Sequence, residues 1–565
     1  MHKIWLDQYP PGIQSEIDMT ECASINEMLR CACQKFSGRP AFKNLGSTMT
    51  YAQLDCLSRD FAAFLQNLPG LQKGARVALM MPNLLQYPVS LFGGLRAGMI
   101  VVNVNPLYTA RELEHQLKDC GAEVIVILEN FAHVLEKVLA CTGIKHVVTT
   151  QIGDLMPAPR RWLVNFVVKH VKKMVPPSHL ERAMRFGTAL RLGARSGLQE
   201  ARPGQRDIAL LQYTGGTTGI SKGAILTHGN LIANLLQASE WSRNILEEGK
   251  EIAVTALPLY HIFSLSMNCL LLTKLGGTNL LITNPQDMRG FIKELRHSRF
   301  SMIVGVDTLF SRLLNTPGFA DVDFRHLRLA LGGASAIHPA VAKRWLATTA
   351  IPLTEGYGLT EAVTYVSCNP WRSEYSGSVG VPAPSTEVSI RDDENRELPF
   401  GREGEICVRG PQVMQGYWNR PEETARAFTA DGWLRTGDIG VMDDRGYVRI
   451  TDRKKDMIIV SGFNVYPNEV EGVIGSMPEV LECGVIGVPD AKTGEAVNAF
   501  VVSSTPELSS EAVIAFCRQN LTSYKIPKAV EFRSELPKSP VGKVLRRELR
   551  SAAVSNQTNA KAAAA

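Results

Sequence analysis

One stretch in the first quarter of the chain alternates strand-like and helix-like patterns, and it restricts the possible folds more than any other feature. Short apolar runs at 76–83, 99–106 and 122–128 are separated by helix-like segments at 84–98 and 110–121. Strands connected through helices in this way pair in parallel and carry the helices on the faces of the sheet. The sequence therefore predicts an α/β core built on a parallel sheet.

The chain of 565 residues is too long for one ordinary domain, so we expect several structural units. The α/β rhythm returns over 207–370, whereas 371–450 is richer in short alternating strands. The pattern changes again near Asp452–Lys455, and a small unit of strands and helices follows. We therefore expect a protein that is α+β overall, with a large N-terminal domain, a small C-terminal domain and a disordered tail over 551–565.

Composition narrows the class of protein. A net charge of +6 is mild for this length, so it does not support a nucleic-acid partner, and we expect none. The eleven cysteines are dispersed, without a C-x-x-C pair or a zinc-like Cys/His cluster, which is typical of a reducing cytosol. The first residues lack the apolar stretch of a signal peptide, and no run reaches the roughly 18 apolar residues of a membrane span. We expect a cytoplasmic protein.

The segment 160–175 predicts a basic amphipathic helix with its apolar residues on one side. Its cations are Arg160, Arg161, Lys169, Lys172 and Lys173. The ordinary interpretation is a surface helix whose apolar face packs into the core of the protein. The alternative is a helix that lies on an anionic membrane, which would associate the protein peripherally with the inner face of the cytoplasmic membrane.

Residues 210–230, LLQYTGGTTGISKGAILTHGN, have the composition of a phosphate-binding loop. A Walker A loop needs glycine directly before the lysine, but here Ser221 precedes Lys222, and the GxGxxG dinucleotide fingerprint is absent as well. The loop nevertheless has the groups that binding of a polyphosphate requires. Glycines allow close approach of the backbone, hydroxyls donate to phosphate oxygens and a lysine supplies a cation. The predicted polyphosphate-binding residues of this loop are Thr214, Gly215, Gly216, Thr217, Thr218, Gly219 and Lys222.

Within this loop, YTGGTTGISKG (213–223) resembles the signature loop of the adenylate-forming superfamily, which includes acyl-CoA synthetases, luciferases and the adenylation domains of peptide synthetases. The usual form has serine at the third position and proline before the lysine, where this chain has Gly215 and Ser221. Gly215 resembles the variant of bacterial long-chain fatty-acid–CoA ligases. The resemblance implies that the polyphosphate held here is that of ATP.

Two further segments resemble motifs of the same superfamily. In EGYGLTE (355–361), a tyrosine offers a flat face for a purine, a threonine offers a hydroxyl for phosphate, and Glu361 offers a carboxylate for Mg²⁺. Upstream, LGGASA (331–336) resembles the strand end that borders adenine and the acyl carboxylate. The resemblance adds Gly333, Gly356, Tyr357, Gly358 and Thr360 to the predicted ATP site, and assigns Mg²⁺ to Thr218 and Glu361.

The last third of the chain carries two more motifs. In DGWLRTGDIGVMDDRGYVRITDRKK (431–455), Asp438 resembles the acid that accepts both ribose hydroxyls, Arg453 the second ribose or phosphate contact, and Lys455 the hinge. In PKSPVGKVLRREL (537–549), Lys543 resembles the catalytic lysine, whose ammonium would orient the attack and spread the developing charge. Both Asp438 and Lys543, with Arg453, are therefore expected in the ATP site.

Two weaker segments complete the predicted site. LPLYHIFSL (257–265) resembles the acyl-pocket motif, and His261 in it joins Lys222 and Lys543 as a candidate catalytic residue. A histidine among apolar residues is usually a core histidine, so this interpretation of His261 also stays open. Near SGFNV (461–465), the resemblance implies a strand that lines the pantetheine tunnel, with Gly462 as the predicted CoA-binding residue.

The resemblance covers nearly the whole chain and implies its organisation. Residues 1–452 would form a large AMP-binding domain with the ATP and acyl pockets and a small β-barrel-like subdomain, 453–455 a hinge, and 456–550 a small mobile α+β domain. The implied activity is a Mg²⁺-dependent ligase: ATP adenylates a long-chain fatty acid, and CoA then takes the acyl group for fatty-acid degradation and lipid metabolism. We expect it to act as a homodimer.

Three alternatives stay open. An adenylation domain that serves a carrier protein would place an acid in 257–265 to grip an amino group, which this chain lacks, and little chain follows residue 550 for a fused carrier. An aryl- or medium-chain-CoA ligase shares the motifs and differs only in pocket shape. A non-catalytic nucleotide-binding or membrane-scaffold protein would have no need for Lys543.

Overall fold

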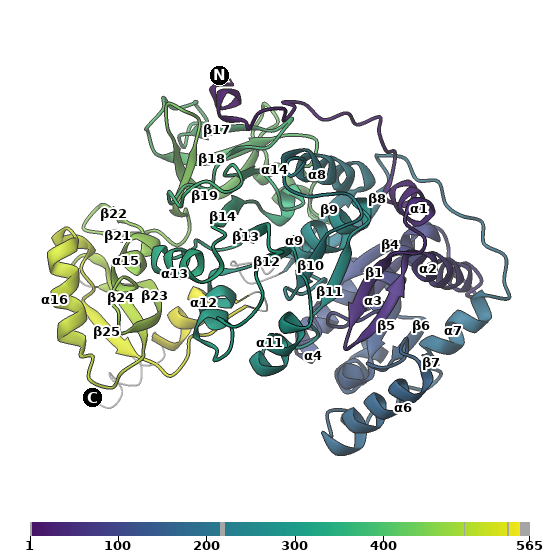
Figure 1. Cartoon of the computed structure of the whole chain (residues 1–565). Helices are drawn as coiled ribbons and strands as arrows, with labels where there is room; N and C mark the ends of the chain where they lie inside the picture. Colours follow the sequence, from purple (N-terminus) through teal and green to yellow (C-terminus); the bar gives the residue numbers. More distant parts are fainter. Residues whose placement is uncertain (1–2, 215–220, 491, 540–541, 554–565) are drawn as a thin grey trace.

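The computed structural model describes residues 3–214, 221–490, 492–539 and 542–553. Two large sheets form the body of the molecule, a smaller antiparallel sheet lies above them, and a C-terminal unit, coloured yellow, lies to one side (Figure 1). This arrangement confirms the expected fold class, with large N-terminal parallel sheets and a small C-terminal α+β domain. None of the helices in the described stretches is long and apolar enough to cross a membrane.

The first large sheet contains the strands predicted from the alternation after residue 75. Its seven strands run in the order β7-β6-β5-β3-β4-β8-β9, and all neighbours are parallel except the hairpin β8–β9. In that order they are Met184–Arg185, His146–Thr150, Ala122–Leu128, Arg76–Met80, Ile100–Asn103, Ile208–Thr214 and Lys222–Thr227. The predicted helices are also present, as α3 (Gln86–Arg96) and α4 (Ala110–Cys120).

The capping residues of helix α4 show how the local sequence determines where a helix begins and ends. Thr109 caps its N-terminus by accepting a hydrogen bond from the backbone of Glu112, whose side chain in turn accepts one from the Thr109 backbone. Gly121 ends the helix with a φ of 61°, a left-handed conformation that glycine adopts without steric cost. The helix therefore begins and ends where its sequence predicts.

The second large sheet has nine strands, in the order β16-β15-β14-β13-β12-β10-β11-β1-β2. The central run from β14 to β1 is parallel, whereas β2, β15 and β16 add antiparallel edges. In sheet order the strands are Val381–Pro382, Ser367–Cys368, Leu353–Tyr357, Leu329–Gly332, Met302–Gly305, Ile252–Thr255, Thr278–Leu281, Pro40–Asn44 and Ser47–Thr50. The candidate motifs at 331–336 and 355–361 therefore lie at the ends of two adjacent parallel strands, β13 and β14.

Helices cover and connect the two sheets (Figure 1). Those of the N-terminal part not yet given are α1 (Ile25–Lys35), α2 (Tyr51–Gln66), α5 (Ala132–Glu136), α7 (Phe186–Gly193), α8 (His228–Trp241), α9 (Ile262–Ser264), α10 (Leu271–Lys274), α11 (Met288–Arg296), α12 (Asp307–Asn315), α13 (Pro339–Thr349) and α14 (Pro421–Ala427). Buried polar groups tie the sheets together: the Asn83 side-chain amide donates to the carbonyl oxygens of Thr255 and Leu257, each at 2.9 Å. These bonds fix the end of the first sheet against the end of the second.

The strand-rich region after residue 371 forms a separate four-stranded antiparallel sheet, where a small β-barrel-like subdomain is expected. Its strands, in the order β17-β18-β19-β20, are Glu387–Arg391, Gly404–Arg409, Leu434–Met442 and Val448–Arg453. Strand β20 ends inside the predicted boundary Asp452–Lys455. The chain passes from there directly into the C-terminal unit.

The C-terminal unit has hydrophobic clusters of its own, distinct from those of the large sheets. Its sheet contains β22 (Phe463–Val465), β21 (Ile458–Val460), β24 (Gly494–Ser503), β23 (Val480–Asp490) and β25 (Ala529–Phe532), with α15 (Pro467–Ile474) and α16 (Ser510–Asn520). The helix that follows Lys543 runs over 546–553, so residues 551–553 do not belong to a disordered tail as expected. The reason is that Ala553 is buried in the same cluster as Leu549 and Phe500.

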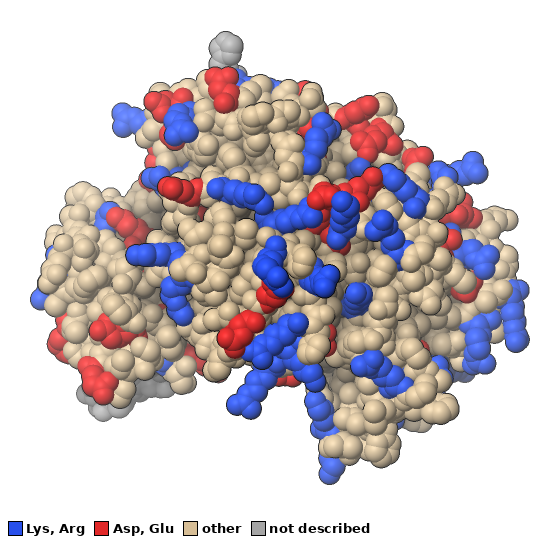
Figure 2. Space-filling view, viewed as in Figure 1, with Lys and Arg blue, Asp and Glu red and all other residues tan. Residues whose placement is uncertain are grey.

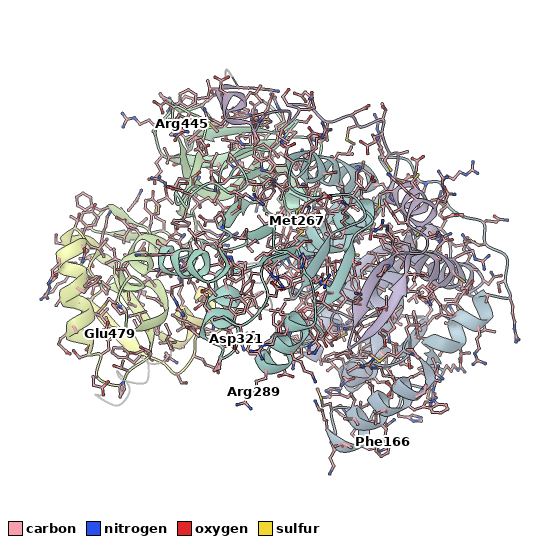
Figure 3. All side chains as sticks on the ribbon, viewed as in Figure 1. Phe166, Met267, Arg289, Asp321, Arg445 and Glu479 are labelled. Carbon is pink, nitrogen blue, oxygen red and sulfur yellow. The ribbon has the colours of Figure 1, made fainter. Side chains whose placement is uncertain are left out.

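The basic amphipathic helix is present as α6 (Ala158–Phe166), which continues as a π-helical segment, Val167–Val171. The ordinary interpretation, an apolar face packed into the core, is wrong, because neither segment contains a buried residue. Trp162 is 68% exposed and Leu163 63%. Figure 2 shows this lower right part of the molecule as largely tan, with blue side chains beside it, and Figure 3 shows Phe166 at its edge.

Candidate functional site

The predicted phosphate loop lies in the chain between the antiparallel strands β8 and β9. Thr214 and Lys222 are paired across the two strands, and the Ser221 hydroxyl donates to the Thr214 carbonyl oxygen. The predicted loop residues between them, Gly215, Gly216, Thr217, Thr218 and Gly219, lie outside the described residues. The pairing of β8 with β9 thus places Thr214 and Lys222 side by side, at the two ends of the predicted loop.

Lys222 belongs to a cluster with two other side chains. Its ammonium lies 5.2 Å from the centre of the Tyr417 ring, a cation–π contact. The Tyr417 hydroxyl donates a hydrogen bond of 2.7 Å to Glu361 Oε1, and burial raises the pKa of this hydroxyl, so it keeps its proton and acts as a donor. Tyr417 therefore connects the predicted phosphate-binding lysine with the predicted Mg²⁺ ligand.

The glycines of the two strand-end motifs allow close backbone contacts. A Cβ atom on Gly358 would lie 1.0 Å from the Thr364 carbonyl oxygen, so no other residue fits there. A Cβ on Gly333 would lie 3.0 Å from Phe263 and 3.3 Å from the Gly356 carbonyl oxygen. These contacts bring the 331–336 and 355–361 motifs together with the segment that contains His261.

Tyr357, Asp438 and Arg453 form a second cluster. Asp438 on β19 is paired with Arg453 on β20, and Arg453 Nε lies 3.0 Å from Asp438 Oδ1. The buried Tyr357 hydroxyl donates to the other carboxylate oxygen, Oδ2, at 2.6 Å. Each carboxylate oxygen has two lone pairs, so Asp438 keeps the capacity to accept further hydroxyl donors. Asp438 raises the pKa of the Arg453 guanidinium, which keeps the ion pair charged.

Lys543 reaches this second cluster from the C-terminal unit. Its loop is fixed by hydrogen bonds from the Ser539 backbone to the Lys543 carbonyl oxygen (2.7 Å) and from the Lys543 backbone to Ser539 Oγ (3.1 Å). The Thr308 hydroxyl on α12 donates to the Gly542 carbonyl oxygen at 3.3 Å, which docks the loop on the large domain. Burial, and then the positive charge of Arg453, lower the pKa of the Lys543 ammonium to about 8.

His261 has features of both open interpretations. It caps the short helix α9, with Nδ1 accepting from the Phe263 backbone at 3.3 Å, and burial lowers its pKa to about 4. The imidazole is therefore neutral near pH 7 and has a structural role at the helix start. Through Phe263 it also borders Gly333, so its segment lies beside the predicted adenine and acyl site.

Three other predicted site residues are not part of the contacts described for the two clusters. Thr360 begins the 3₁₀ turn Thr360–Ala362, directly before Glu361. Lys455 is exposed in the turn that follows β20. Gly462 has a φ of 83° in the exposed turn between β21 and β22, where a Cβ atom would meet nothing within 4 Å. In this orientation of the C-terminal unit, Gly462 therefore does not join the cluster that contains Lys543.

Sequence reasoning missed two residues that hold this site together. Tyr417 has no distinctive local pattern, because it is one of several aromatic residues in a strand-rich region. Arg546 lies in the 537–549 motif, but its local sequence does not show which residues it contacts. Its guanidinium contacts Glu471 at 2.7 Å, Asp452 at 3.2 Å and Asp456 at 3.4 Å, on both sides of the predicted hinge.

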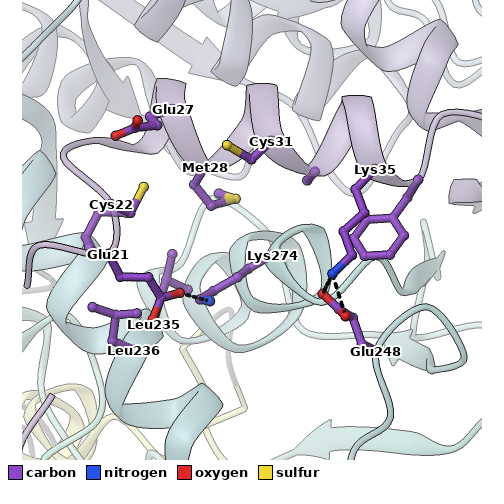
Figure 4. Close-up of a pocket in the computed structure, with 13 residues that line it drawn as sticks. Glu21, Cys22, Glu27, Met28, Cys31, Lys35, Leu235, Leu236, Glu248 and Lys274 are labelled. Carbon is purple, nitrogen blue, oxygen red and sulfur yellow. Dashed lines mark hydrogen bonds and ion pairs between the residues drawn. The ribbon is translucent and has the colours of Figure 1, made fainter. Parts of the chain in front are cut away.

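A hollow of about 190 Å³ opens elsewhere, between α1 and the helices α8 and α10 (Figure 4). Ion pairs of 2.6 Å cross its rim, from Lys274 to Glu21 and from Lys35 to Glu248. None of the predicted site residues lines it. The candidate active site is therefore the region around the two clusters, and not this hollow.

Family models match both parts of the chain. The AMP-binding enzyme model matches residues 29–418, which is more than half of the chain, and the model of the AMP-binding enzyme C-terminal domain matches residues 469–543. This chain belongs to the AMP-binding enzyme family. The match includes the β8–β9 hairpin, Glu361 and Tyr417 in the first model and Lys543 at the end of the second.

Relatives within the AMP-binding enzymes cover almost the full length. A long-chain-fatty-acid–CoA ligase of Escherichia coli O157:H7 is 55% identical over 551 residues, 97% of this chain and 98% of the relative. Among solved structures, ATP-bound MatB from Rhodopseudomonas palustris has a TM-score of 0.79 at 29% identity, covering 94% of this chain and 99% of its own. An anthranilate CoA ligase, AuaEII, in complex with anthranoyl-AMP has a TM-score of 0.84 at 25% identity, covering 96% and 100%.

The residues of this family member also fit a Mg²⁺ ion that arrives with a nucleotide. Among the described residues there is no group of three or more His, Cys, Asp or Glu side chains that would hold a metal alone. Mg²⁺ in proteins is typically bound by one or two carboxylates together with substrate phosphates. Glu361, oriented by Tyr417 and close to Lys222, is a carboxylate of this kind.

Proposed function

We propose that this protein is an AMP-forming long-chain-fatty-acid–CoA ligase of fatty-acid degradation and lipid metabolism. The observation that carries the proposal is the 55% identity over 97% of the chain to a relative with that name. It is supported by the two clusters, one with Lys222 and Glu361 and the other with Asp438 and Lys543. A pure nucleotide-binding protein would not need a lysine delivered from a second unit.

The first half-reaction forms acyl-AMP. A fatty-acid carboxylate oxygen attacks the α-phosphorus of ATP, a new acyl–O–P bond forms, the bond to the β-phosphate oxygen breaks, and pyrophosphate leaves. Catalysis of such a transfer is mainly positioning and charge stabilisation. We assign Lys222, Thr214 and the hairpin residues 215–219 to the β- and γ-phosphates, Asp438 and Arg453 to the ribose, and Lys543 to the reacting carboxylate and α-phosphate.

The remaining predicted residues complete this site. Gly333, Gly356, Tyr357, Gly358 and Thr360 are assigned to the nucleotide, and His261 to the wall of the acyl pocket. Glu361 and Thr218 would hold Mg²⁺, which would neutralise phosphate charge. Glu361 is supported in this role by the hydrogen bond from Tyr417, which fixes the direction of the carboxylate.

The second half-reaction transfers the acyl group. The CoA thiolate attacks the acyl carbonyl carbon, a thioester forms, and AMP leaves with the electrons of the broken C–O bond. We propose that domain 456–550 first rotates about the hinge 453–455, with Lys455 as the pivot, relative to domain 1–452. The rotation would withdraw Lys543 and bring Gly462, now in an exposed turn, to the pantetheine path.

An assay of pyrophosphate release with palmitate, benzoate and amino acids, with and without CoA, tests this proposal. A long-chain ligase releases pyrophosphate with palmitate and forms palmitoyl-CoA and AMP when CoA is added. Benzoate as the preferred acid would indicate an aryl-CoA ligase, and amino acids without use of CoA would indicate a carrier-dependent adenylation domain. No release with any acid would refute the enzyme proposal.

Where the protein acts is a separate proposal. We place it in the cytoplasm, as a homodimer in peripheral contact with the inner face of the cytoplasmic membrane. The exposed apolar side chains of α6 support the membrane contact. Cell fractionation at low and high salt tests the location, and light scattering after gel filtration tests the dimer.

A further inference from the structure

The helix 158–171 and the residues that follow it present a continuous apolar strip to solvent. Trp162, Leu163 and Phe166 lie on one side of α6, and Val171 and Met174 extend the strip to its end; the exposed fractions of their side chains run from 50% to 68%. We call these five residues the outer strip. Apolar side chains gathered in this way on a surface mark a site of interaction with a protein or a membrane.

Polar contacts attach the helix to the rest of the protein. Asn165 donates to Gln151 Oε1 at 2.9 Å and accepts from the Gly153 backbone at 2.8 Å. Arg160 donates to the Gly46 carbonyl oxygen at 2.9 Å, and Asn130 donates to the Met174 carbonyl oxygen at 2.9 Å. Hydrogen bonds along its length therefore hold the helix in an orientation that keeps the outer strip exposed.

The charge around the outer strip indicates what covers it. Residues 158–175 contain five cations and no Asp or Glu. Lys169, Lys172 and Lys173 are exposed near the C-terminal end of the strip. A partner that accepts both features has an apolar interior and a negatively charged surface, which describes an anionic lipid bilayer. Tryptophan is also a side chain that favours the bilayer interface.

We propose that the outer strip and its flanking lysines are the surface that docks this protein on anionic membranes. The apolar side chains enter the boundary between headgroups and acyl chains, and the lysines contact lipid phosphates. This inference rests on the proposed peripheral contact and names the part of the chain that makes it. It places the enzyme on the phase in which long-chain fatty acids dissolve.

Co-sedimentation of the full-length protein with lipid vesicles tests the surface. The vesicles are phosphatidylcholine alone or phosphatidylcholine mixed with phosphatidylglycerol, at low and high salt. One variant, Trp162→Ser/Leu163→Ser/Phe166→Ser, removes most of the outer strip, and a second, Lys169→Gln/Lys172→Gln/Lys173→Gln, removes the flanking charge. We expect the first to lose about tenfold or more in affinity for the mixed vesicles, and the second to lose the preference for phosphatidylglycerol and the salt dependence.

Matched controls change the same residue types elsewhere. Leu346→Ser/Leu481→Ser removes exposed leucines, and Lys293→Gln/Lys343→Gln/Lys492→Gln removes exposed lysines, all distant in sequence from α6. Both controls should bind vesicles like the natural protein. Activity of every variant on octanoate, a soluble acid, reports whether it is folded.

Three results would overturn the proposal. If the natural protein binds vesicles and the outer-strip variant binds equally well, another surface makes the membrane contact. If the natural protein binds neither vesicle, the peripheral association itself fails. If the outer-strip variant changes from dimer to monomer in gel filtration while its vesicle binding is unchanged, the strip is an interface between two copies of the chain.

Discussion

The Tyr417 hydroxyl donates a 2.7 Å hydrogen bond to the Glu361 carboxylate, while the Lys222 ammonium lies over the same ring. One side chain therefore positions two groups of opposite charge that are assigned to the nucleotide's phosphates and their metal. Tyr417 is also fixed itself, because its backbone N–H donates to the Thr424 hydroxyl at 2.9 Å. We infer that Tyr417 is a positioning residue for the adenylation step.

Replacement of Tyr417 by Phe should impair adenylation through Glu361. The variant keeps the ring under Lys222 but removes a hydrogen bond to a charged group, which typically contributes about 1.5–3 kcal/mol. We expect the rate of pyrophosphate release to fall about tenfold or more and the Mg²⁺ concentration for half-maximal rate to rise. Tyr417→Leu, which also removes the cation–π contact, should lose about a further twofold to fivefold.

Tyr9→Phe is the matched control for this pair of variants. It removes another part-buried hydroxyl, which donates to the Pro382 carbonyl oxygen at 2.7 Å and not to a residue of the two clusters. Its Mg²⁺ requirement should equal that of the natural protein. If Tyr417→Phe also keeps a normal Mg²⁺ requirement, Tyr417 does not act through Glu361.

Lys543→Ala should separate the two half-reactions. Loss of an ammonium that stabilises charge in the transition state typically costs about 10²–10³ in rate, so adenylation should fall by that factor. Thioester formation from supplied acyl-AMP and CoA should continue at close to the natural rate, because the hinge rotation withdraws this lysine. Lys538→Ala on the same loop, which removes an ion pair to Glu482, is the control and should spare adenylation. Equal loss of both half-reactions in Lys543→Ala would contradict this division.

The protonation of Lys543 should set the alkaline limit of adenylation. Burial and Arg453 hold its pKa at about 8, below the ordinary lysine value of 10.5. The ammonium is present below this pKa and is lost as the pH rises through it, so kcat/KM for pyrophosphate release should decline near pH 8 rather than above pH 10. Lys543→Arg should move this decline upwards, since arginine stays protonated. A natural profile that stays flat well above pH 8 would argue against an essential Lys543 ammonium.

Local sequence patterns predict much of the secondary structure. They do not predict contacts between residues that are distant in the sequence. The strands and helices of 76–128 follow from apolar runs and caps such as Thr109 and Gly121, which depend on neighbouring residues only. Tyr417 and Glu361 are separated by 56 positions, and no local pattern pairs them. For the helix at 160–175 the periodicity indicated an amphipathic helix but not which side faces the protein, because that depends on Asn165 meeting Gln151 and Gly153.

Arg546→Met should loosen the hinge and the Lys543 loop together. The Arg546 side chain is 11% exposed and neutralises Asp452, whose side chain is fully buried, along with Asp456 and Glu471. Removing one partner of a buried ion pair typically costs about 3–5 kcal/mol, so the free energy of unfolding of the C-terminal unit should fall by that amount. Hydrogen exchange should accelerate over the C-terminal unit while the large sheets stay protected.

The exposed neighbour Arg547 provides the control, because Arg547→Met removes the same charge without breaking buried ion pairs. It should leave both hydrogen exchange and adenylation near their natural values. In Arg546→Met, adenylation should fall more than thioester formation from supplied acyl-AMP, since Arg546 lies three residues after Lys543, at the start of the helix 546–553, and ties this part of the chain to Asp452. Identical exchange rates in the two variants would show that the Arg546 network does not hold the C-terminal unit in place.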